Sequence, residues 1–136
     1  MPPMTTPEKI FSVHEANQLL PHVIPLIQQL QGLQQSILKT NADIESGAQK
    51  LSQGNGYPIH EIRKQVEELT QHQLNLLQAF QSAYQQLEGL GCVLKDLSVG
   101  LVDFYGLRDE ELVFLCWKLD EEKIQFWHGL EEGFAA

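Results

Sequence analysis

The side chains best suited to chemistry lie in the last third of the chain. They are two aspartates, a cysteine, a histidine and a glutamate: Asp96, Asp103, Cys116, His128 and Glu131. Two carboxylates and an imidazole that converge could bind a divalent cation or carry out acid–base hydrolysis. We therefore predict that any metal site is formed by Asp96, Asp103 and His128. Because carboxylate oxygens are hard ligands, the ion would be Mg²⁺ or Mn²⁺ rather than a thiol-bound zinc.

The same residues also have structural interpretations, and we favour these. Asp96 and Asp103 can be turn or strand-edge residues that bond to nearby backbone, and Cys116 can be a small buried apolar side chain. His128 precedes a glycine and fits a turn. Three neighbours of the possible site, Lys95, Trp117 and Trp127, include two aromatics that suit core and edge positions.

The spacing of these residues matches no established catalytic motif. The sequence has no HExxH, no GxSxG, no phosphate-binding glycine loop and no zinc-type cysteine pair. The motifs therefore favour neither an enzyme nor a binding protein.

Composition restricts the class of protein and its partners. With 136 residues, 43% apolar and 20% charged, the chain is predicted to fold as a globular protein. The formal net charge of -9 argues against binding to nucleic acid or to an anionic membrane surface. Two isolated cysteines and the absence of a signal-type or membrane-spanning apolar run predict a soluble, cytoplasmic protein.

Two long apolar repeats predict the helices on which the rest of the chain is organised. The spacing alternates between four and three residues, as in a coiled coil, which predicts two helices at about Pro21 to Lys50 and Pro58 to Glu88. The glycine- and proline-containing segment 52–58 predicts the turn that joins them. The first seam is Leu19, Val23, Leu26, Leu30, Leu33, Ile37, Thr40, Ile44, Gly47 and Leu51; the second is Ile59, Ile62, Val66, Leu69, Gln73, Leu76, Phe80, Ala83, Leu87 and Leu90.

The N-terminal part carries both a helix start signal and a helix break signal. Ser12 and Glu15 have the spacing of a capping box. Pro21 and Pro25 lack amides, so we expect a short helix over Val13 to Leu19 and a break before the long one. Residues 1–10 are predicted to be a disordered tail.

After Gly91 the apolar period becomes strand-like. Four candidate strands cover 92–97, 100–105, 112–119 and 123–128, with a polar loop at 106–111. Their short connections predict an antiparallel meander. The expected fold is α+β: one domain over 11–136, with a helical hairpin at 11–91 followed by a sheet region at 92–136.

The helices have more apolar positions than one seam requires. Glutamines make much of their outer face neutral, and a second apolar flank consists of Ile27, Leu38, Leu74, Leu77 and Tyr84. Since a two-helix hairpin cannot cover so wide a stripe by itself, we predict a homodimer formed through the hairpin.

Several short motifs resemble a family of uncharacterised bacterial proteins, the domain of unknown function DUF2203. The resemblance rests on segments 11–17, 19–21, 95–97, 100–104, 115–118, 127–128 and 133–135. It supports the fold and implies no activity. The leading functional hypothesis is a self-associating interaction or scaffold module. The alternative is a divalent-metal-binding protein or small metal-dependent hydrolase that uses the acids of the sheet region.

Overall fold

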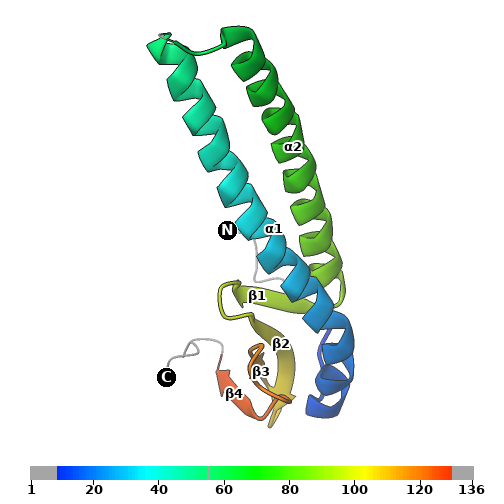
Figure 1. Ribbon diagram of the computed structural model, residues 1–136. Coiled ribbons are helices and arrows are strands. Elements are labelled where there is room, and N and C mark those ends of the chain that lie inside the picture. The colour runs from blue at the N-terminus through cyan, green and yellow to red at the C-terminus, as the bar shows by residue number, and fades with distance from the viewer. Residues whose placement is uncertain (1–8, 55, 130–136) are drawn as a thin grey trace, which may run out of the picture. The chain divides into compact units, whose positions relative to one another are not determined.

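The computed structural model describes residues 9–54 and 56–129, and for Phe126 and His128 only the backbone (Figure 1). Two helices, α1 (Val13–Gln53) and α2 (Ile59–Gly89), precede four strands. The strands are β1 (Cys92–Asp96), β2 (Leu101–Arg108), β3 (Glu111–Trp117) and β4 (Phe126–Gly129). The predicted α+β architecture, a helical hairpin followed by an antiparallel meander, is confirmed.

The described chain forms two compact units. The sheet unit contains residues 9–29 and 84–129, and the hairpin unit contains Leu30–Ala83. The sheet unit therefore includes the first turns of α1 and the end of α2, whereas the sequence pattern predicts both in the hairpin. Of the predicted tail at 1–10, residues 1–8 lie outside the described residues, and Lys9 and Ile10 are exposed.

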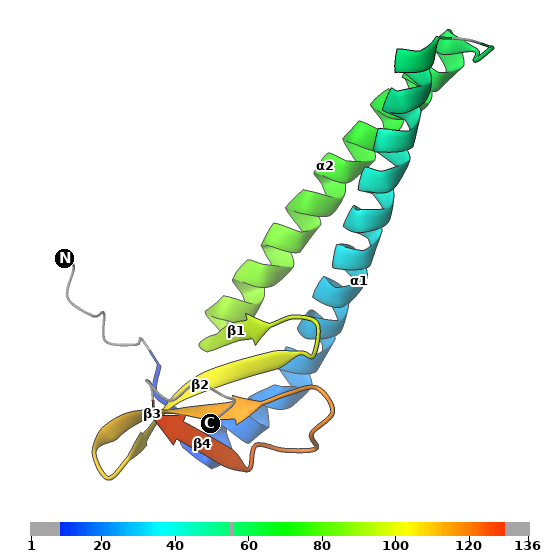
Figure 2. The ribbon, with the colours of Figure 1, turned by 90° about the vertical axis from the view of Figure 1, so that its left-hand side faces the viewer.

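The sheet has the order β1-β2-β3-β4, with every neighbouring pair antiparallel (Figure 2). One face of it packs within the sheet unit on the inner side of α1, where Ala16, Leu20, Val23 and Ile27 are buried. Since these residues recur every three or four positions, they form one stripe of the helix. The largest fully buried side chains opposite them on this face are Val102, Phe104 and Trp117.

The predicted helix break at Pro21 is wrong. Helix α1 is continuous, with Pro21 and Pro25 inside it. Both prolines are exposed and one helical turn apart, so their rings point away from the sheet. Because the buried stripe on the other side anchors these turns to the sheet, packing outweighs the loss of two backbone hydrogen bonds. The predicted capping box is present: Ser12 Oγ accepts from the Glu15 amide at 3.1 Å, and Glu15 Oε1 accepts from the Ser12 amide at 2.9 Å.

The predicted polar loop at 106–111 is also wrong. Strands β2 and β3 extend to Arg108 and Glu111, which pair with each other, so only Asp109 and Glu110 form the turn. Their φ angles of 51° and 67° lie in the left-handed region, as a two-residue hairpin turn that matches the twist of its strands requires. Neither residue is a glycine, so the segment lacks the usual signal of a tight turn.

In the hairpin unit the two helices lie side by side and antiparallel (Figures 1 and 2). The predicted seam is confirmed, since its positions there are buried or half-buried except for Ile59 in the first turn of α2. Gln73 Nε2 donates to the carbonyl of Ile37 at 3.0 Å, which fixes the register of the two helices. The connection between them contains Gly54 and Gly56, with φ of 71° and 74°.

Candidate functional sites

Asp96 has the structural role that the sequence suggested. It ends β1, is exposed, and its Oδ1 accepts hydrogen bonds from the Ser98 hydroxyl at 2.6 Å and the Ser98 amide at 3.0 Å. These bonds favour the ionised form, so they lower the pKa of Asp96. The carboxylate therefore stabilises the turn between β1 and β2.

Asp103 does not lie in a turn or at a strand edge, so that structural interpretation is wrong. It is 2% exposed in β2, an inner strand, where its backbone pairs with Val93 on one side and Cys116 on the other. Directly opposite residues in adjacent strands share a face, which places the Cys116 thiol beside the carboxylate. Burial raises the pKa of Cys116, and its hydrogen bond to Asp103 acts in the same direction. This thiol is consequently protonated and unreactive at neutral pH.

The structure describes only the backbone of His128, which pairs with Phe114 in β3. The residue of β4 that pairs with Cys116 is Phe126. His128 is therefore two cross-strand pairs further along the sheet than Asp103 and two strands away. Within the described residues no three His, Cys, Asp or Glu side chains form a metal-binding group. The site at Asp96, Asp103 and His128 stays a prediction, and Glu131 lies outside the description.

The neighbours of this predicted site are held by other contacts. Lys95 Nζ lies 4.8 Å from the centre of the Phe114 ring, a cation–π distance. Trp117 is completely buried, and its indole N–H donates to the Glu121 carbonyl at 3.0 Å. Trp127 is half exposed, and the Arg108 guanidinium stacks on it at 3.9 Å. The expected core position of Trp117 is thus confirmed.

The hairpin unit carries a different kind of candidate site, a band without charge. Residues 30–38 of α1 and 69–83 of α2 contain no Asp, Glu, Lys or Arg. The hydrogen bond between Gln73 and Ile37 joins the two segments, so they form one level of the hairpin. The part of the hairpin unit beyond it, residues 39–68, contains all of the unit's charged residues: Lys39, Asp43, Glu45, Lys50, Glu61, Arg63, Lys64, Glu67 and Glu68. We call residues 30–38 and 69–83 the charge-free band.

Three leucines of the charge-free band are exposed to solvent. Leu38, Leu74 and Leu77 are 65%, 50% and 47% exposed. Each follows a seam residue by one position (Ile37, Gln73 and Leu76). In two antiparallel right-handed helices, the positions that follow the seam fall on the same side of the pair. The three leucines therefore share one side of the hairpin.

Two members of the predicted apolar flank are not available for contact with a partner. Ile27 is completely buried in the sheet unit, and Tyr84 is half-buried there. Covering by the chain's own sheet thus accounts for part of the surplus apolar surface. The exposed remainder consists of the three leucines.

Within the described residues, neither helix has an apolar stretch that could span a lipid bilayer.

Comparison with known proteins identifies the family of this chain. Neither curated proteins nor solved structures yield a match. A family model described as "Uncharacterized conserved protein (DUF2203)" matches residues 9–136, which is nearly the whole chain. The chain belongs to the DUF2203 family.

Proposed function

We propose that the protein is a self-association module whose hairpin binds a second copy of itself through the charge-free band. The observation that supports this most is the exposure of Leu38, Leu74 and Leu77 on one side of a band without charge. A solvated helix face ordinarily carries charged residues. Neutral amides and leucines are less costly to remove from water than carboxylates or ammonium groups.

The overall charge supports a second copy as the occupant. Each chain has a net charge of -9, so two copies repel unless they meet where charge is absent. The charge-free band provides such a surface on both partners, and a two-fold axis would bring the same leucines together. The resulting four-helix arrangement would cover the apolar stripe.

Sedimentation equilibrium of the wild type from roughly 10 to several hundred micromolar tests this proposal, since weak dimers dissociate in that range. We expect a dimer that is retained or strengthened in high salt, because salt screens the repulsion between acidic copies. Leu38→Glu combined with Leu74→Glu should give a monomer with the helical content of the wild type.

A matched control is available on the opposite side of the hairpin. Ser36→Glu combined with Asn75→Glu adds the same charge at two exposed positions that each precede a seam residue, Ile37 and Leu76. This variant should remain a dimer. A wild type that is monomeric at every concentration, or a control that dissociates as completely as the leucine variant, would overturn the proposal.

The second candidate is binding of Mg²⁺ or Mn²⁺ by Asp96, Asp103 and His128. The burial of Asp103 on an inner strand supports it, since protected carboxylate oxygens suit a hard cation. Metal analysis and thermal melting of the wild type, Asp103→Asn and His128→Ala test it. A metal-dependent rise in melting temperature that both substitutions abolish is the expected result. Melting of the wild type that is unaffected by metal and chelator would exclude it.

A further inference from the structure

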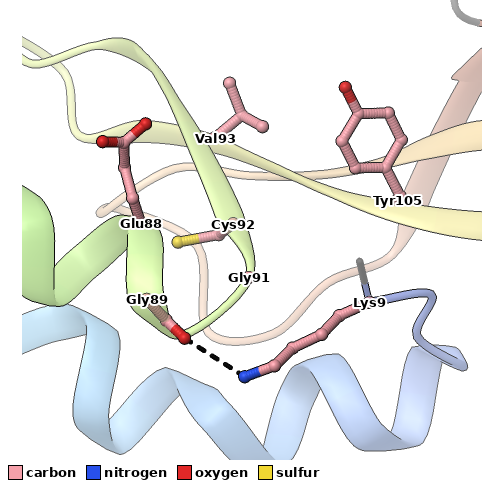
Figure 3. Close-up of a pocket in the computed structure, with 7 residues that line it drawn as sticks. All are labelled: Lys9, Glu88, Gly89, Gly91, Cys92, Val93 and Tyr105. Atoms are coloured by element: carbon pink, nitrogen blue, oxygen red, sulfur yellow. Dashed lines mark hydrogen bonds between the residues drawn. The ribbon is translucent and has the colours of Figure 1, made fainter. Parts of the chain in front are cut away.

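The sheet unit contains a cavity of about 230 Å³ at the C-terminal end of α2 (Figure 3). It is smaller than the roughly 300–1,000 Å³ typical of sites for drug-sized ligands, so an occupant must be small. The lining combines two opposite charges with a phenol and an apolar side chain. The residues are Lys9, Glu88, Gly89, Gly91, Cys92, Val93 and Tyr105.

Lys9 is held at this cavity by the segment that precedes α1. Its Nζ donates to the carbonyl of Gly89 at 3.1 Å, where the negative end of the helix dipole favours a cation (Figure 3). Two residues later the Phe11 amide donates to the Tyr105 carbonyl at 2.7 Å, and the Phe11 ring packs edge-on against Phe104. The ammonium is thus positioned, and two of its three protons remain for a ligand.

Gly91 makes this close approach possible. Its φ is 102°, and a Cβ atom there would lie 2.8 Å from the Phe11 ring and 2.9 Å from Lys9 Cδ. A side chain at this position would force the Phe11 ring and the Lys9 side chain to shift, and the positive φ disfavours any residue other than glycine. The backbone is therefore adapted to the position of Lys9.

Glu88 is the second charged group, and its place in the helix is unfavourable. It lies in the last turn of α2, which carries no basic residue, and the helix dipole there opposes a negative charge. Among the described residues an ion pair joins Lys39 and Asp43, but none joins Lys9 and Glu88. Lys9 and Glu88 thus line one cavity without neutralising each other, and a ligand with both charges could bind the two together.

The remaining lining limits what else the cavity can do. The Cys92 thiol donates to the Leu87 carbonyl at 3.4 Å, and burial raises its pKa to about 12. It is therefore not a nucleophile at neutral pH. Val93 and the Tyr105 ring, which packs on Phe114 at 5.0 Å, provide an apolar wall (Figure 3). The cavity is suited to binding rather than to reaction.

We propose that this cavity binds a small zwitterion, a free amino acid with an apolar side chain. Glu88 accepts from its ammonium group, Lys9 donates to its carboxylate, and its side chain lies against Val93 and Tyr105. Because exposed charge pairs are individually weak, the dissociation constant should be on the order of 1 mM.

Titration of the full chain with leucine, N-acetyl-leucine and leucinamide, followed by NMR chemical shifts, tests the proposal. Leucine should saturate the shifts of residues around the cavity. Loss of the ammonium in N-acetyl-leucine, or of the carboxylate in leucinamide, should weaken binding about tenfold, as expected for one charge-assisted contact. Equal binding of all three compounds, or no saturable shift with leucine at about 20 mM, would overturn it.

Variants separate the two charged roles. Lys9→Met keeps the aliphatic chain and should weaken leucine binding about tenfold while leaving leucinamide binding unchanged. Glu88→Gln should also weaken leucine binding about tenfold, but it should leave the binding of N-acetyl-leucine unchanged. Lys64→Met and Glu67→Gln, both exposed on the hairpin unit, are matched controls and should bind leucine like the wild type. If the controls weaken binding as much as the cavity variants, the site is not this cavity.

Discussion

The sheet unit and the hairpin unit bury their apolar residues to different extents. In the sheet unit Val102, Phe104 and Trp117 are completely covered, because a helix layer lies on a sheet layer. In the hairpin unit two helices meet along one line, and only Leu30, Thr40, Ile62 and Ala83 of its described residues are buried. The sheet unit thus has a packed core, whereas most residues of the hairpin unit contact solvent. We expect stability to depend on the first and association on the second.

The largest predicted effect comes from removing the same side chain in each unit. Phe104→Ala in β2 should lower the free energy of unfolding by about 3–5 kcal/mol, since it leaves a cavity in a closed core. Phe80→Ala in the half-buried seam should cost less than half as much, because water can reach the space. Urea denaturation followed by circular dichroism measures both losses. Equal losses would mean that the hairpin is as tightly packed as the sheet unit.

A second pair of substitutions compares the seam of the hairpin with its outside. A Cβ added to Gly47 would lie 2.6 Å from Val66 Cγ2, whereas a Cβ added to Gly32 would point into open space. Gly47→Ala should destabilise by about 1–2 kcal/mol through overpacking. Gly32→Ala should stabilise by up to about 1 kcal/mol through helix propensity.

Thermal melting of the two alanine variants measures these opposite shifts. Adding Val66→Ala to Gly47→Ala should restore part of the lost stability if the clash is the cause. A stabilising effect of Gly47→Ala alone would show that the helices can move apart at no cost, and that the seam is looser than the structure indicates.

The sheet unit should also be the part of the molecule that is sensitive to alkali. Burial raises the pKa of Cys92 from 9.0 to about 12. Since the unfolded thiol ionises first, stability is unaffected below pH 9 and falls as the pH rises from 9 toward 12. At pH 10 the loss is about 1 kcal/mol. The difference in urea midpoint between wild type and Cys92→Ala at pH 8 and pH 10 isolates this contribution; an unchanged difference would contradict it.

The smallest predicted effect concerns the first turn of α1. Ser12→Ala removes the capping hydrogen bond and should cost about 1 kcal/mol. The amide and hydroxyl of Ser12 lower the pKa of Glu15 below 4.5. The stability from this ionised carboxylate is therefore present above pH 4.5 and is lost as the pH falls through the lowered value. Acid titration of wild type and Ser12→Ala should converge at low pH; parallel curves would exclude the capping role.

The sequence predicted what depends on periodicity and local chemistry. The alternating three- and four-residue spacing located the seam from Leu30 to Ala83, and Ser12 with Glu15 marked the helix start. It failed where tertiary packing decides. Nothing local to Pro21 shows that the stripe from Ala16 to Ile27 will hold the helix together, and nothing local to Asp103 shows that its strand lies inside the sheet.

The candidate sites follow the same division. The glutamines and leucines of the charge-free band could be seen in the sequence, although their common side could not be identified without the antiparallel pairing. The cavity at the end of α2 joins Lys9 to Glu88, which are distant in sequence and share no motif. Such a site depends on the path of the chain, so a motif search has no means of finding it.

The two left-handed glycines of the helix connection also affect assembly. Gly54 and Gly56 reverse the chain, so α1 and α2 satisfy their seam within one molecule. If both were alanine, a straight helical connection would become less costly relative to the turn. The seam of α1 could then pair with α2 of another molecule, giving an exchanged dimer by domain swapping. These two glycines thereby favour pairing of α1 with α2 of the same chain over pairing with α2 of a neighbouring chain.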